Sequence, residues 1–126
     1  MSRPHFAYAI DLREPDTWNF DAVNTWATRC DAIVDLVYAD PGGVLSADHV
    51  LAPDLRRRLT EALAKARERD DEAINALLER IPAQNRGRSH ILGGEPRTLI
   101  PEYAVDYDSL IVTTRNHHGI RRAFLG

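Results

Sequence analysis

The sequence predicts an α/β domain, a three-layer sandwich in which helices cover both faces of a parallel sheet. Two observations lead to this prediction. Short apolar runs alternate with segments of helical spacing, and the runs end at turn-forming or charged residues, at Asp11, residues 40–43 and Gly93-Gly94. Enough chain separates successive runs for the long crossovers that parallel strands require. The length of 126 residues indicates one domain, residues 1–126.

The first half of the chain predicts two strands and one helix. Residues 5–12 (HFAYAIDL) form a buried strand whose apolar residues end at Asp11. Residues 18–30 form a helix with one apolar face, made by Phe20, Val23, Trp26 and Ala27. Residues 32–39 form the second strand, which Asp-Pro-Gly-Gly at 40–43 terminates.

A long helix is predicted over residues 53–81, between Pro53 and Pro82. The polar stretch 67–72 interrupts it and is a candidate bend. One apolar stripe runs along it, formed by Leu55, Leu59, Ala62, Leu63, Ala66, Ala73, Ile74, Leu77, Leu78 and Ile81.

The last third predicts strand, helix and strand. Residues 89–92 form a short strand before Gly93-Gly94, and Glu95-Pro96 opens a helix. The final strand covers residues 110–113 and leads into a polar, basic loop.

Composition excludes several classes of protein. No apolar run reaches the roughly 20 residues of a membrane span, and the N-terminus has no signal peptide, so a cytoplasmic protein without a membrane partner is expected. The net charge of −3 argues against a general nucleic-acid binder. Cys30 is the only cysteine, which excludes an internal disulfide. We expect a buried, inert thiol at Cys30 rather than a reactive one.

Several known site types are absent from the sequence. Neither the glycine-rich dinucleotide fingerprint nor the phosphate-loop pattern occurs, and no zinc-type spacing or nucleophile–base arrangement stands out. His117 and His118 are adjacent, and we interpret them as hydrogen-bond donors to an anion rather than as a metal pair. Asp35 interrupts an apolar strand and therefore needs a partner or a bulge. We expect its charge to reach an edge or solvent.

Two segments are candidates for a ligand site. Asp11 ends the first strand, where a carboxylate accepts hydrogen bonds from a ribose or a base; the alternative is a cap for the following loop. The loop 113–126 contains Arg115 and other basic residues but no acid. It predicts either an anion site or a solvated basic surface.

The stretches GGEPRTLIPEYA and DSLIVTTRNHHGIRRAFLG, together with AIDL and IVDLVYADP, resemble the universal stress protein family. The segment GEPRTLIPEYA most resembles the tandem-domain subgroup of that family. The resemblance implies that family's fold and, from its ATP-binding members, a set of nucleotide-binding positions. Those positions correspond here to Asp11, Tyr38, Thr113, Arg115, Asn116 and Gly126.

The chain also departs from the family pattern. Thr113 and Asn116 stand where the family's phosphate loop has glycines, and a side chain there crowds the approach of a phosphate. The helix and fifth strand that follow this loop in the family are missing after Gly126. We therefore expect a C-terminally incomplete domain whose strand at 110–113 has an exposed edge, covered by more chain or by a partner subunit.

These features predict a cytoplasmic regulatory module of the stress response with a degenerate adenine-nucleotide site for ATP. The resemblance implies a homodimer, or pairing with a second domain of the same kind. The alternative is a dimerisation or protein-interaction module that binds no nucleotide. A nucleotide hydrolase is a third reading, for which the sequence offers no obvious base or metal site.

Overall fold

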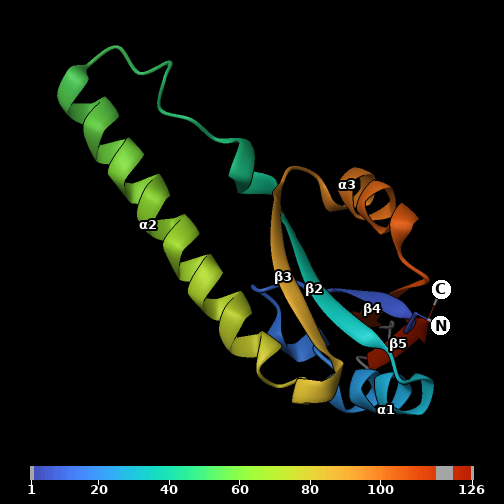
Figure 1. Cartoon of the computed structure of the whole chain (residues 1–126). Coiled ribbons are helices and arrows are strands. Elements are labelled where there is room, and N and C mark those ends of the chain that lie inside the picture. Colours follow the sequence, from blue (N-terminus) through green and yellow to red (C-terminus); the bar gives the residue numbers. More distant parts are fainter. Residues whose placement is uncertain (1, 116–120, 126) are drawn as a thin grey trace.

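The computed structural model describes residues 2–115 and 121–125 and has a five-stranded sheet at its centre (Figure 1). The strand order is β3-β2-β1-β4-β5, with the first four parallel and β5 antiparallel to β4. The strands are β1 (His5–Ala9), β2 (Ile33–Asp40), β3 (Arg86–Gly93), β4 (Ser109–Arg115) and β5 (Arg121–Leu125). The α-helices are α1 (Phe20–Cys30), α2 (Pro53–Leu78) and α3 (Pro96–Tyr103). The predicted α/β sandwich is confirmed.

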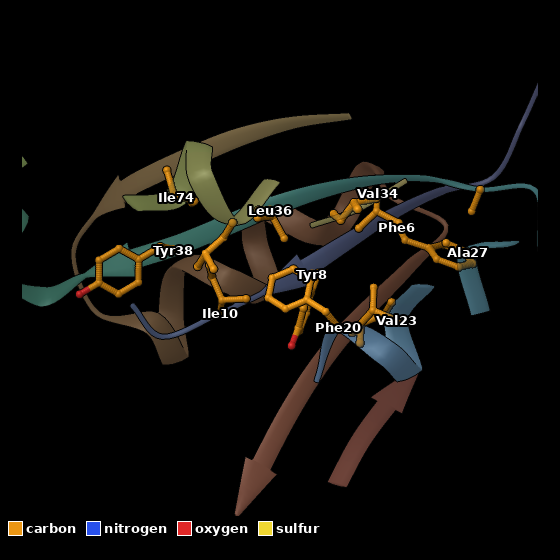
Figure 2. Packing of buried hydrophobic residues seen from close by; sticks show 14 residues of the cluster. Phe6, Tyr8, Ile10, Phe20, Val23, Ala27, Val34, Leu36, Tyr38 and Ile74 are labelled. Atoms are coloured by element: carbon orange, nitrogen blue, oxygen red, sulfur yellow. The ribbon is translucent and has the colours of Figure 1, made fainter. Parts of the chain in front are cut away.

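One face of the sheet packs against α1 and the C-terminal end of α2. Alternate residues of β1 and β2 point to this side, as the period of a strand requires. Figure 2 shows Tyr8 of β1 beside Phe20 and Val23 of α1, and Leu36 of β2 near Ile74 of α2. The rings of Tyr8 and Phe20 meet edge-on, with their centroids 5.5 Å apart. This is the larger of the two cores.

The opposite face carries a smaller core under α3. Val37 and Ala39 of β2 pack there with Ile100, and half-buried residues surround them. Right-handed crossovers account for this division, because the chain passes from β1 through β2 to β3 in one direction and then returns across the sheet to β4. The direction of travel reverses between β1 and β4.

Helix α2 is one continuous helix, so the expected bend at 67–72 is wrong. Its apolar stripe divides into two parts. Ile74 and Leu77 are buried against the sheet, whereas Leu55 and Leu59 remain 51% and 39% exposed. Figure 1 shows the reason, since the green N-terminal part of α2 extends past the sheet.

The segment after β4 differs from the expected ligand loop. Thr113 and Thr114 continue β4 to Arg115, and the chain returns as β5, with Thr113 paired to Ala123. β-branched residues favour strand, and Thr113 lacks the backbone freedom of the expected glycine. The expected exposed edge at 110–113 is therefore wrong, because β5 covers it. No helix follows β4 within the described residues.

Cys30 is exposed, which corrects the expectation of a buried thiol. It is the last residue of α1, three residues beyond Ala27, the last buried residue of that helix. Within the described part of the chain, the helices are too short or too polar to span a bilayer.

Candidate functional site

A pocket of about 530 Å³ opens at the carboxyl ends of the parallel strands, between β1, β2, β4 and α3. It lies beside the pair β1 and β4, where the chain reverses its direction across the sheet. Open α/β sheets hold ligands at such a reversal, because the loops on its two sides diverge. The fold therefore places a cavity where this architecture binds small molecules.

Three predicted site residues, Asp11, Tyr38 and Thr113, line this one pocket. They come from three neighbouring strands or strand ends, and the parallel register brings them together. Arg115 belongs to β4, but its side chain lies outside the described part of the chain, as do Asn116 and Gly126. The predicted hydrogen-bond donors His117 and His118 also lie outside the described residues.

Asp11 is held in a turn directly after β1. Its Oδ1 accepts a hydrogen bond from the Arg13 amide at 2.9 Å, and its carbonyl accepts one from Trp18 Nε1 at 2.8 Å. The carboxylate therefore caps the loop while remaining exposed at the rim of the pocket. The two alternatives for Asp11 are compatible, because the cap orients a carboxylate that still has acceptor capacity.

Tyr38 and Asp40 form the end of β2. Asp40 Oδ1 accepts from the Gly42 amide at 3.0 Å and lies 3.5 Å from Arg13 Nη2. Burial and the nearby Asp40 carboxylate raise the pKa of Tyr38 to about 12. Its hydroxyl is therefore a neutral hydrogen-bonding group at physiological pH.

Thr113 also contacts the core beneath the pocket. Its side chain is hydrogen-bonded to the hydroxyl of Tyr8. The same hydroxyl accepts from the Asn19 amide at 2.9 Å, at the start of α1. Thr113 thus links β4 to β1 and α1 at the position where a glycine was expected.

Two further cations, Arg13 and Arg97, line the pocket. Neither was predicted from the sequence as a site residue. Arg13 follows β1 by a few residues, and Arg97 lies in the first turn of α3. The signal in the sequence was weak, since each is a lone arginine in a turn or helix start. The crossover that carries α3 back over the sheet brings them to the same cavity. Glu14 and Thr17 add further polar groups to the lining. Much of the remaining wall is apolar and includes Ala9, Ile10, Ala39, Ile100, Leu110 and Val112.

A second polar cluster surrounds Asp35, away from the pocket. Asp35 Oδ2 accepts from the Tyr107 hydroxyl at 2.6 Å and lies 3.1 Å from His5 Nε2. Its Oδ1 accepts from the Arg88 amide at 2.7 Å. The prediction that Asp35 needs a partner or a bulge is confirmed, whereas the expectation that its charge reaches an edge or solvent is wrong, because the residue is 4% exposed.

Comparison with known proteins gives one match. A sequence model of the universal stress protein family matches residues 9–126. No individual curated protein matches the chain significantly. The matched range contains every residue that lines the pocket.

Proposed function

This chain belongs to the universal stress protein family, and on that premise we propose that it is a cytoplasmic regulatory module of the stress response whose pocket binds an adenine nucleotide such as ATP. The observation that carries the proposal is the joint position of Asp11, Tyr38 and Thr113 in one cavity at the reversal point of the sheet.

The lining of the pocket suits the parts of a nucleotide. An apolar wall of small and branched side chains accepts a flat base, as ligand pockets of this size commonly do. The exposed Asp11 carboxylate is an acceptor for ribose hydroxyls. Arg13 and Arg97 supply positive charge for phosphate oxygens.

The phosphates would be held here by other groups than in the usual site of the family. Thr113 replaces a glycine and lies in β4, so the backbone there is paired with Ala123 of β5. Phosphate recognition then depends on arginine side chains rather than on a glycine-rich turn. Arginine contacts to phosphate are strong but exposed here, since the Arg13 side chain is 65% exposed. We expect modest affinity that weakens with added salt.

The experiment is a thermal-shift titration of the intact chain with ATP. We expect a saturable rise in melting temperature, because a ligand that binds only the native state stabilises it. Asp11→Ala and Arg97→Ala should each reduce the shift. Glu102→Ala is the matched control, since Glu102 is an exposed acid on α3 that does not line the pocket. Absence of any shift at millimolar ATP rejects the proposal.

A second function has one observation in its favour. The N-terminal part of α2 exposes apolar side chains that no described residue buries. Such a surface supports a protein-interaction module that needs no nucleotide. A folded protein that self-associates but gives no shift with ATP is the outcome that selects this alternative.

A further inference from the structure

The N-terminal part of α2, residues 53–72, projects from the domain, and we call it the arm. No side chain in the arm is buried, whereas Ile74 and Leu77 just beyond it are. Figure 1 shows the arm as the green part of the helix, which extends beyond β3 and β2. The arm has few contacts with the rest of the domain, among them a hydrogen bond from Arg67 Nη2 to the Leu45 carbonyl at 3.2 Å, although helices in proteins gain most of their stability from tertiary packing. A binding partner along the arm would supply the missing packing.

Exposed apolar side chains concentrate on the arm and the segment that leads into it. Six large hydrophobic residues are exposed in the described part of the chain, and five of them lie between residues 44 and 59. These five are Val44, Leu45, Leu51, Leu55 and Leu59. Exposed apolar residues scattered singly need no explanation, but a cluster of this kind marks an interaction surface.

The spacing of the arm's apolar residues is that of a helix-pairing seam. Leu55, Leu59, Ala62 and Ala66 follow one another at intervals of four, three and four residues. Two-stranded coiled coils repeat their contact positions in this way. The two alanines that end the seam allow close approach of a second helix.

The charges of the arm decide which helix fits this seam. Arg56, Arg57 and Arg58 occupy its beginning, where the helix dipole disfavours cations, and Asp70, Asp71 and Glu72 occupy its end. In an antiparallel pair with Ala62 opposite Ala66, residues 56–58 of each copy come level with residues 70–72 of the other. A parallel pair would instead align like charges.

These charges are available for a partner. Among the described residues, Arg56, Arg58 and the three carboxylates at 70–72 form no ion pair within the chain. Arg57 has only a long contact of 3.7 Å with the exposed Asp54. The helix therefore carries two clusters of opposite charge, one beside the first residues of the apolar seam and one beyond its last residue, Ala66.

We propose that the arm pairs antiparallel with the arm of a second copy of this chain. The apolar seam supplies the buried surface, and the two charge clusters fix the orientation and register. The interface uses no residue that lines the pocket, so the inference stands independently of nucleotide binding.

The test is sedimentation velocity on the intact protein over a broad concentration range. We expect a monomer–dimer equilibrium. The charge-reversed variant with Arg56→Glu, Arg57→Glu and Arg58→Glu should raise the dissociation constant at least about tenfold, and the variant with Asp70→Arg, Asp71→Arg and Glu72→Arg should do the same. An equimolar mixture of the two should recover the dimer, because each arm then meets its complement.

The control is the pair Glu102→Arg and Asp106→Arg, exposed acids outside the arm, which should leave the equilibrium unchanged. A second measurement avoids dependence on the folding of the triple variants. In a Cys30→Ser background, Ala62→Cys mixed with Ala66→Cys should form an intermolecular disulfide under mild oxidation. A wild-type protein that stays monomeric, a dimer that survives both charge reversals, or a mixture that stays monomeric overturns the proposal.

Discussion

At the scale of single residues, Asp35 and Gly87 explain how an acid is accommodated in a buried strand. The pairing of β2 with β3 shifts between Val34 and Leu36, where two residues of β3 lie opposite Asp35. This bulge turns the Arg88 amide toward Oδ1 of Asp35. The carboxylate occupies the space next to the Cα of Gly87, where a Cβ would clash with it. The acid and the glycine thus depend on each other.

Gly87→Ala is predicted to destabilise the domain by about 1–3 kcal/mol, because the new methyl group must displace the Asp35 carboxylate and the Val34 carbonyl. Chemical denaturation measures this change. Gly42→Ala is the matched control, since a Cβ at Gly42 meets its neighbours only at ordinary contact distances of 3.4 and 3.9 Å. Equal stability of the two variants would contradict this account of the bulge.

Asp35 also predicts how stability depends on pH. Burial alone would raise the pKa of Asp35, but hydrogen bonds from Tyr107 and the Arg88 amide, with the nearby His5, lower it below its ordinary value. A lowered carboxyl pKa contributes stability above the unfolded-state pKa of about 3.9, and that contribution is lost as pH falls through the lower folded-state pKa.

Asp35→Asn is therefore expected to be less stable than wild type at pH 7, with the difference narrowing as pH falls below about 4. Urea titrations at several pH values measure both proteins. Asp21→Asn, at an exposed acid on α1, should track the wild-type curve. A difference between Asp35→Asn and wild type that stays constant down to pH 2 would argue that the native state does not lower the pKa of Asp35.

At the scale of elements, the strands and helices were largely predictable because the signals for them are local. The apolar run of β2 and the helical spacing of α1 depend on neighbouring residues, and both were located within two residues of their observed ends. The exposure of the arm was not predictable. Periodicity identifies which side of a helix is apolar, but it carries no information on how far the sheet beneath it extends.

The hairpin of β4 and β5 shows a second limit of the sequence. The resemblance to the family implied a loop after residue 113, although Thr113 and Thr114 are strand-forming residues. Local propensity and the antiparallel pairing with β5 determined the outcome. For the pocket, Asp11, Tyr38 and Thr113 followed from family positions. Arg13 and Arg97 did not, because their convergence depends on where α3 crosses the sheet.

Leucine-to-alanine substitutions in the two parts of α2 are expected to change the stability of the domain by different amounts. Leu77→Ala should cost about 2–5 kcal/mol, because it leaves a cavity in the core beneath α2. Leu55→Ala should change the stability of the monomer by no more than about 0.5 kcal/mol, because its side chain is half exposed. Denaturation at dilute, monomeric concentration measures both. A comparable loss at Leu55 would mean that the arm packs on its own domain.

At the scale of the whole molecule, the pocket and the arm are separate surfaces. The pocket lies at the carboxyl ends of the strands beside α3, and the arm belongs to α2 on the other face of the sheet. No residue of the arm lines the pocket. The family fold is thus expected to carry a ligand site and an association surface that operate independently.

If the pocket and the arm operate independently, a substitution in one should leave the property of the other unchanged. Asp11→Ala should lose the ATP response and keep the wild-type dimer equilibrium. The charge-reversed arm with substitutions at 56–58 should dissociate and keep the same apparent affinity for ATP. Thermal shift and sedimentation on the same samples measure both properties. A change in ATP affinity that follows dimer dissociation would reveal a coupling between the two surfaces.

The central claim is that an adenine nucleotide occupies the pocket between Asp11 and α3. Titration of the ¹⁵N-labelled chain with ATP, followed by amide chemical shifts, tests this most directly. Saturable shifts should appear at residues 9–14, at Ala39 and at Arg97, with none at the exposed residues Thr28 and Arg29 of α1. The absence of saturable shifts at millimolar ATP, or shifts confined to residues outside the pocket, would contradict the claim.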